Sequence, residues 1–167
     1  MLRIGEGFTG VGAHSAHVSL LLGPNALLGN AFAVAAASPR LGHIPFQVVL
    51  KPNVAAKPAT LFIAKCVLRD AHHERLTWGP AQAGVAAGIT RALLEGVLPE
   101  SAQSGWLAIA LVWVDAAASD AELLYANNAA ATHAAAGRAM AEDRPTRAEL
   151  VEALASIGNP YFTPAHH

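Results

Sequence analysis

Apolar residues alternate with polar or small residues in two short stretches near the amino terminus. Residues 1–9 and 16–22 therefore predict two strands, joined by a turn that is rich in glycine, Gly10 to Gly12. Successive side chains of a strand point to opposite faces of a sheet. The second strand is expected to present His17, Ser19 and Leu21 on one face and Val18, Leu20 and Leu22 on the other.

The remainder of the chain alternates between apolar, β-branched runs and helical patterns. Further strands are predicted over 43–50, 60–68 and 105–114, with a loop over 51–57 between the first two. Helices are predicted over 26–37, from Pro80 to Gly96, from Ser119 to Met140 and from Thr146 to Ile157; the last two begin with capping-box patterns. This mixture predicts an α+β fold, a mixed β-sheet with helices packed on one face, in a single domain over residues 1–167.

Composition favours a protein that buries surface against other subunits. Hydrophobic residues make up 53% of the chain and charged residues only 14%, against about a quarter in typical domains. The apolar excess is mostly alanine, which gives flat helix faces that pack closely. A formal net charge of −1 with no basic cluster argues against nucleic acid as a partner.

The same features indicate a cellular location. Cys66 is the only cysteine, so an internal disulfide is excluded and a reducing compartment is favoured. The longest apolar run, Trp106 to Val114, is too short to span a bilayer, and the amino terminus does not resemble a secretory signal. We expect a soluble cytoplasmic protein without a membrane partner. His166 and His167 are either native or the remnant of a purification tag.

Two motifs could indicate a dinucleotide or a metal site, but neither has the sequence context that such a site requires. Residues 5–10 match the spacing G-x-G-x-x-G, but too few residues precede them for a first strand, and a strand follows instead of a helix. These glycines are expected to permit a bent strand and a tight turn. The pairs His14/His17 and His72/His73 lack neighbouring ligands at metal-binding spacing, so no metal site is expected.

Three polar side chains are candidates for chemistry. His17 is suited to proton transfer near neutral pH, although a half-buried structural histidine is the simpler interpretation of a lone residue. Lys65 lies within an apolar run and is either functional or on the solvated face of an edge strand. Gln82 begins a helix rich in glycine and alanine, where its amide either caps the first turn or binds a ligand.

Short blocks occur along the chain in an order that resembles the formaldehyde-activating enzyme family. The resemblance extends from Gly5 to about Phe162, and no single block is specific to the family. The matching blocks are Gly5-Glu6, Ala16-His17, Gly23-Pro24, Pro52-Asn53, Lys57-Pro58 with Thr60-Leu61, Lys65, Asp70-Ala71, Gly79-Pro80-Ala81-Gln82 with Gly84-Val85 and, more loosely, Gly96 with Pro99 and Asn159-Pro160-Tyr161-Phe162.

The resemblance implies a fold, an assembly and a reaction. The fold would be similar to the second domain of ribosomal protein S5, and the assembly would be a homopentamer that binds a pterin between neighbouring subunits. The reaction would condense formaldehyde with tetrahydromethanopterin, a co-substrate, to give methylene-tetrahydromethanopterin and water, in one-carbon metabolism or formaldehyde detoxification. The match assigns His17 as the proton donor, and Lys65 and Gln82 as pterin contacts. Neither metal nor redox cofactor is required, because the oxidation state of the carbon does not change.

Pocket positions where this chain departs from the family suggest an alternative function. Ser19 replaces an aspartate, Gln47 a leucine and Val67 a threonine, while Val11 replaces an aspartate in the turn. A missing carboxylate at position 19 would leave His17 less readily protonated. The alternative is a non-catalytic or weakly active paralogue that binds or senses formaldehyde or a pterin; a purely structural oligomer is a third hypothesis, which leaves Lys65 unexplained.

Overall fold

The structure is a computed structural model, and it describes residues 1–141, 145–158 and 163–165. The strands are β1 (Arg3–Thr9), β2 (Ala16–Pro24), β3 (Ile44–Gln47), β4 (Val49–Lys51), β5 (Val54–Ala55), β6 (Ala59–Ala64) and β7 (Trp106–Trp113). The helices are α1 (Asn25–Ala37), α2 (Ala71–Leu76), α3 (Gln82–Leu94), α4 (Ala102–Gly105), α5 (Ala121–Met140) and α6 (Arg147–Ala155), with a 3₁₀ turn at Gly12–His14 and a π turn at Thr77–Ala81. None of the described helices is long and apolar enough to cross a lipid bilayer.

Five strands form a mixed sheet in the order β1-β2-β7-β6-β3. Neighbouring strands are antiparallel except β6 and β7, which run parallel, so the carboxyl ends of these two strands lie at the same edge of the sheet. The predicted strand over 43–50 divides at Val48, whose side chain is fully buried. Beyond it, β4 pairs with β5 in a separate hairpin, so the predicted loop over 51–57 contains a strand.

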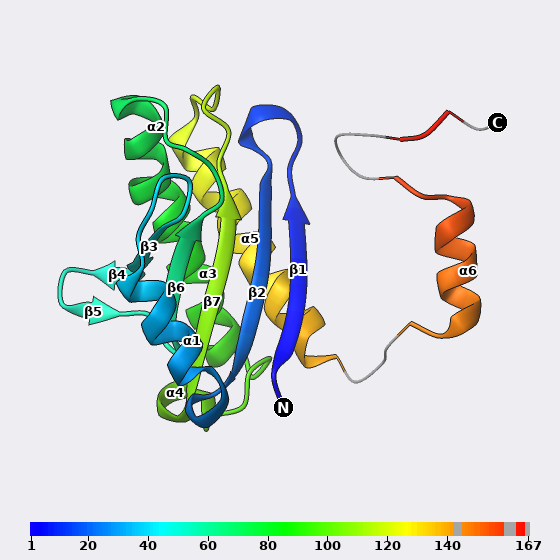
Figure 1. The fold of residues 1–167 in the computed structure, drawn as a ribbon, viewed down its shortest axis with the longest axis horizontal. Coiled ribbons are helices and arrows are strands. Elements are labelled where there is room, and N and C mark those ends of the chain that lie inside the picture. Colours follow the sequence, from blue (N-terminus) through cyan, green and yellow to red (C-terminus); the bar gives the residue numbers. More distant parts are fainter. Residues whose placement is uncertain (142–144, 159–162, 166–167) are drawn as a thin grey trace.

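Helices cover both faces of the sheet, which confirms the α+β prediction but corrects the expectation of helices on one face only (Figure 1). On one face α3 and α5 pack against the fully buried side chains of Val18, Leu20 and Leu22. On the other face α1 places Leu28 in a smaller apolar cluster with strand residues such as Leu61 and Ile109. The sequence prediction missed this placement because α1 is apolar on all sides and its pattern does not indicate which sheet face it covers.

Two glycines of β1 allow this strand to lie directly on the backbone of α5. A Cβ atom added at Gly7 would lie 1.8 Å from the carbonyl oxygen of Ala131, and one added at Gly5 would lie 2.0 Å from that of Ala135. In the turn that follows, Gly10 has φ +85°, in the left-handed region. The G-x-G-x-x-G pattern therefore serves packing and a turn, as the sequence indicated.

The helix boundaries depart from the prediction at two places. Asp70 caps α2, a helix that the sequence analysis missed, and the chain continues through the π turn into α3, so Pro80 lies inside a continuous helical segment. Asp120 caps α5 in place of the predicted Ser119, because its carboxylate accepts a hydrogen bond from the backbone N–H of Leu123. The predicted capping box at Thr146 is confirmed at α6.

Candidate functional site

A cavity of about 480 Å³ opens on the sheet face that carries α1, at the end of the strands away from this helix. Its lining residues are His17 on β2, Trp113 at the end of β7, and Lys65 and Asp115, which follow β6 and β7. The antiparallel register places His17 directly opposite Trp113. Lys65 and Asp115 meet here because parallel strands bring their carboxyl ends to one edge. Residues from β2 and from the ends of β6 and β7 therefore line this one cavity.

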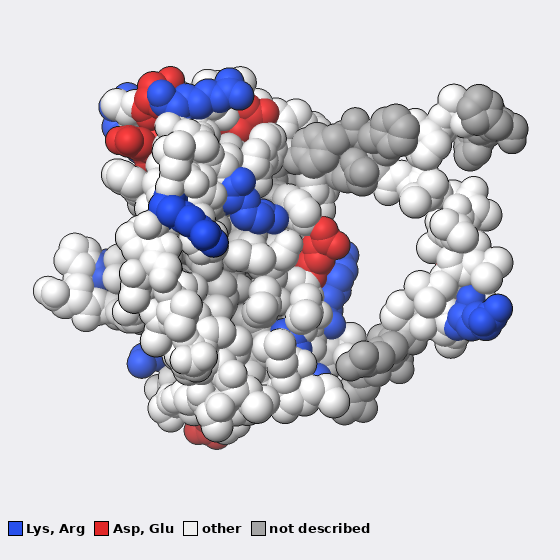
Figure 2. All heavy atoms as spheres, in the orientation of Figure 1, with Lys and Arg blue, Asp and Glu red and all other residues white. Residues whose placement is uncertain are grey.

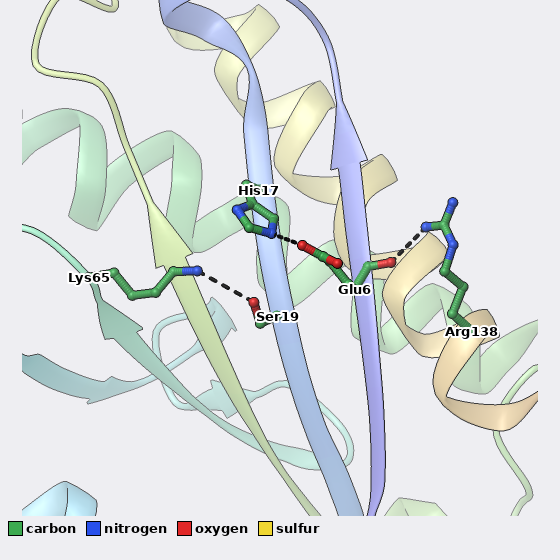
Figure 3. Close-up of polar contacts among 5 residues, drawn as sticks. All are labelled: Glu6, His17, Ser19, Lys65 and Arg138. Carbon is green, nitrogen blue, oxygen red and sulfur yellow. Dashed lines mark hydrogen bonds and ion pairs between the residues drawn. The ribbon is translucent and has the colours of Figure 1, made fainter. Parts of the chain in front are cut away.

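His17 contacts a carboxylate that the sequence analysis did not assign. The imidazole Nε2 of His17 is hydrogen-bonded to the carboxylate of Glu6 on β1, and the other ring nitrogen, Nδ1, lies on the side of Lys65 (Figure 3). The β1–β2 register explains the contact, because it pairs Glu6 with Ser19 and so puts Glu6 diagonally across from His17 on the same face. Arg138 of α5 holds the strand there by donating to the backbone oxygen of Glu6 at 2.7 Å.

This arrangement fixes how His17 can exchange protons. The His17 side chain retains 29% of its exposure, and that of Glu6 retains 67%. An imidazole whose Nε2 is held by a carboxylate presents Nδ1 as the atom for proton transfer, as in other His–carboxylate pairs. His17 therefore has a carboxylate partner in this structure even though position 19 carries a serine.

Lys65 extends across β7 to the strand that carries His17. Its Nζ donates to Ser19 Oγ at 3.4 Å, and its backbone N–H donates to the carbonyl oxygen of Val112 at 2.8 Å. Among the described residues Lys65 forms no salt bridge. Partial burial lowers the pKa of Lys65, and the negative charge of Glu6 opposes this effect.

The structure brings together only some of the predicted site residues. His17 and Lys65 line the cavity and Ser19 is joined to it through its hydrogen bond with Lys65, whereas Gln82 lies on α3, which covers the opposite face of the sheet. The amide oxygen of Gln82 accepts a hydrogen bond of 2.6 Å from the backbone N–H of Val49 in β4. That bond is neither of the two roles that the sequence analysis considered.

Neither of the two other substituted positions lines the His17 cavity. Gln47 ends β3, paired with Leu61, and is exposed. Val67 lines a neighbouring cavity of about 370 Å³ that also includes Cys66 and the buried His73. In a single copy of the chain, the six predicted residues therefore form one site of three residues and three separate positions.

Three site residues were missed by sequence reasoning, namely Glu6, Trp113 and Asp115. A signal existed for each of them. Glu6 shares the two-residue alternation that assigns His17 to its face, once the two strands are paired as a hairpin. Trp113 and Asp115 are two residues apart at the end of a predicted strand, which puts them on one face.

Three further histidines, His14, His72 and His73, have structural partners. His14 Nε2 accepts from the backbone N–H groups of Ser119 and Asp120 at the start of α5. His72 and His73 are bonded to backbone oxygens of Ala118 and Val114. Within residues 1–141, 145–158 and 163–165, no three His, Cys, Asp or Glu side chains are grouped as metal ligands.

Comparison with known proteins identifies relatives along nearly the whole chain. The family model described as formaldehyde-activating enzyme (Fae) matches residues 4–162. The chain is 36% identical over 159 residues to the 5,6,7,8-tetrahydromethanopterin hydro-lyase of Methanosarcina barkeri, covering 95% of this chain and 89% of that protein. It is 37% identical to the bifunctional enzyme Fae/Hps of Archaeoglobus fulgidus and 38% identical to that of Methanoregula boonei. These matches cover 83% and 84% of this chain, but only 35% and 36% of the longer relatives.

Proposed function

The chain belongs to the formaldehyde-activating enzyme family, and we propose that it condenses formaldehyde with tetrahydromethanopterin to give methylene-tetrahydromethanopterin and water. It would thereby act as a lyase of the 5,6,7,8-tetrahydromethanopterin hydro-lyase type, in one-carbon metabolism or formaldehyde detoxification. The support from relatives is identity over nearly the whole of a single-function enzyme. The support from geometry is a cavity that pairs a histidine with a lysine.

The difficult step of this reaction is the loss of water from the hydroxymethyl intermediate. A pterin amine adds to formaldehyde, and the resulting hydroxyl group leaves as water only after it receives a proton. In our proposal His17 Nδ1 donates that proton, while Glu6 holds the opposite nitrogen and orients the ring. Proton donation of this kind typically contributes about 10²–10⁴-fold to a rate, and confinement of both reactants in one cavity adds an entropic gain.

The observation that carries the proposal is the contact between Glu6 and His17 at the cavity that Lys65 shares. The alternative of a weakly active or sensing paralogue rested chiefly on the absence of a carboxylate at Ser19, and it is less favoured because His17 still has a carboxylate partner in Glu6.

We further propose a homopentamer whose sites lie between subunits. Apolar side chains at Ile4, Leu27 and Val34 are 67%, 54% and 56% exposed, and much of the face in Figure 2 carries no charge. A shared site would also give roles to Gln82, Gln47 and Val67, since these residues could contact a pterin bound at the His17 cavity of an adjacent copy.

The fold, in our proposal, resembles the second domain of ribosomal protein S5. The chain would form a single domain over residues 1–167, and the protein would work in the cytoplasm. His166, His167 and the block 159–162 lie outside the described residues.

The test of the proposed activity is formaldehyde-dependent conversion of tetrahydromethanopterin by purified protein, with the spontaneous reaction subtracted. A rate well above the spontaneous one supports the proposal. A parallel assay with tetrahydrofolate measures selectivity for the pterin. If neither pterin reacts faster than it does without protein, the proposed function is wrong.

A further inference from the structure

Lys65 is placed to do more than contact a ligand. Its Nζ reaches Ser19, two residues from His17 on the same strand and the same face. Residues two apart on a strand are separated by about 6.5–7 Å. The lysine amine and the imidazole therefore lie close to each other and line the same cavity, together with Trp113.

We propose that Lys65 captures formaldehyde covalently as an iminium ion and transfers the one-carbon unit to the pterin. This inference rests on the proposed function and adds a nucleophile to it. The cavity supplies what such chemistry requires, namely a primary amine next to a proton donor.

The chemical steps balance without any additional reagent. The lone pair of neutral Lys65 Nζ attacks the carbon of formaldehyde, and after proton transfer from nitrogen to oxygen the product is a carbinolamine. His17 protonates the hydroxyl group, water leaves, and a methylene iminium forms on Lys65. A secondary amine of the pterin attacks that carbon and loses its proton, returning the C=N electron pair to the lysine nitrogen. The lysine nitrogen is then protonated and leaves as the amine, and the second pterin nitrogen closes the methylene bridge with loss of its own proton.

The surroundings of Lys65 favour the neutral amine that the first step needs. The atom that receives its hydrogen bond is a neutral hydroxyl, and no salt bridge holds the ammonium form among the described residues. Partial burial lowers the pKa of Lys65 in the same direction, although Glu6 raises it.

The experiment traps the iminium in wild-type protein without pterin. Limiting formaldehyde is added with excess cyanoborohydride, and peptide mass spectrometry follows methylation of the three lysines, Lys51, Lys57 and Lys65. Lys51 and Lys57 are internal controls in the same molecules. We expect Lys65 to be methylated first, and His17→Ala to slow only Lys65, by about 10²-fold or more if the imidazole is the acid for dehydration. Methylation of Lys65 no faster than Lys51 and Lys57 overturns the inference.

A second experiment separates this inference from the proposed function. Lys65→Arg keeps the positive charge but removes the amine, so turnover should fall towards the spontaneous rate while pterin binding persists. If Lys65→Arg turns over like wild type, covalent capture is wrong and the proposed function stands. If wild type traps formaldehyde at Lys65 but converts no pterin, the capture stands and the proposed function is wrong.

Discussion

Replacing Gly7 by alanine is expected to destabilise the protein and to disturb the site at the same time. The added Cβ atom would lie 1.8 Å from the carbonyl oxygen of Ala131, which is 1.2 Å inside the 3.0 Å limit that real Cβ contacts respect. The obstructing atom is helix backbone, so the strain can be relieved only if β1 moves away from α5. Overpacking of this kind costs about 1–3 kcal/mol and occasionally more, and we expect about 3 kcal/mol here because no side chain can yield.

The same displacement would move the residue next to it, Glu6, which contacts His17. We therefore expect a loss of condensation activity in Gly7→Ala in protein that is still folded, since small domains have about 5–15 kcal/mol of stability. The activity loss distinguishes a strand that positions the site from one that only packs.

The assay is thermal unfolding together with turnover, and Gly137→Ala is the matched control. A loss of about 3 kcal/mol corresponds to a fall in Tm of roughly 6–12 °C for a chain of this size. Gly137 lies on α5 with no atom within 4 Å of its added Cβ, so its replacement should stabilise by about 0.4–1 kcal/mol. A Gly7→Ala protein with unchanged Tm and full activity would refute the close packing of β1 on α5.

Four further outcomes are expected. Glu6→Gln should slow turnover by removing the carboxylate partner that orients the His17 ring, and NMR titration should show a further fall in the pKa of Lys65, because the charge of Glu6 raises it; an unchanged rate would exclude the carboxylate from the mechanism. Covalent capture needs neutral Lys65, so activity should rise with pH as this amine loses its proton; Ser19→Asp places a negative charge near Nζ, raises the pKa of Lys65 and should move that rise to higher pH, whereas Ser19→Ala should not move it upwards. Gln82→Ala should raise the KM for the pterin more than it lowers kcat, while the lost bond to the exposed Val49 costs at most about 1 kcal/mol of stability; an unchanged KM would remove Gln82 from the site. Light scattering should give a mass of about five times 17.2 kDa, and a stable monomer in dilute solution would exclude a site between subunits.

The alternation of apolar and polar residues in the strands was the sequence feature that predicted most of the fold. The alternation in 16–22 assigned His17 and Ser19 to the face opposite Val18, and the fully buried Val18 confirms that assignment. The residues at which helices begin were harder to predict from the sequence, because neighbouring residues can both act as the N-cap. Ser119 and Asp120 are adjacent residues that can both cap a helix, and the structure uses Asp120.

The site was predictable only where a residue type carried its own chemistry. His17 and Lys65 were identifiable as candidates, and both line the cavity. Glu6 became identifiable only through the register of β1 with β2, and Asp115 through the parallel pairing of β6 with β7. Register and strand order follow from packing of the whole domain. The side chains that surround His17 and Lys65 could therefore not be inferred from spacing along the chain.

The most direct test of the central claim compares wild type with His17→Ala in the condensation of formaldehyde with tetrahydromethanopterin. Initial rates are measured at saturating pterin, with the spontaneous reaction subtracted and folding of the variant verified by its unfolding transition. If His17 donates the proton, the wild-type rate should lie well above the spontaneous one and fall by about 10²–10⁴-fold in His17→Ala. A variant that turns over as fast as wild type would contradict the assignment of His17 as the proton donor.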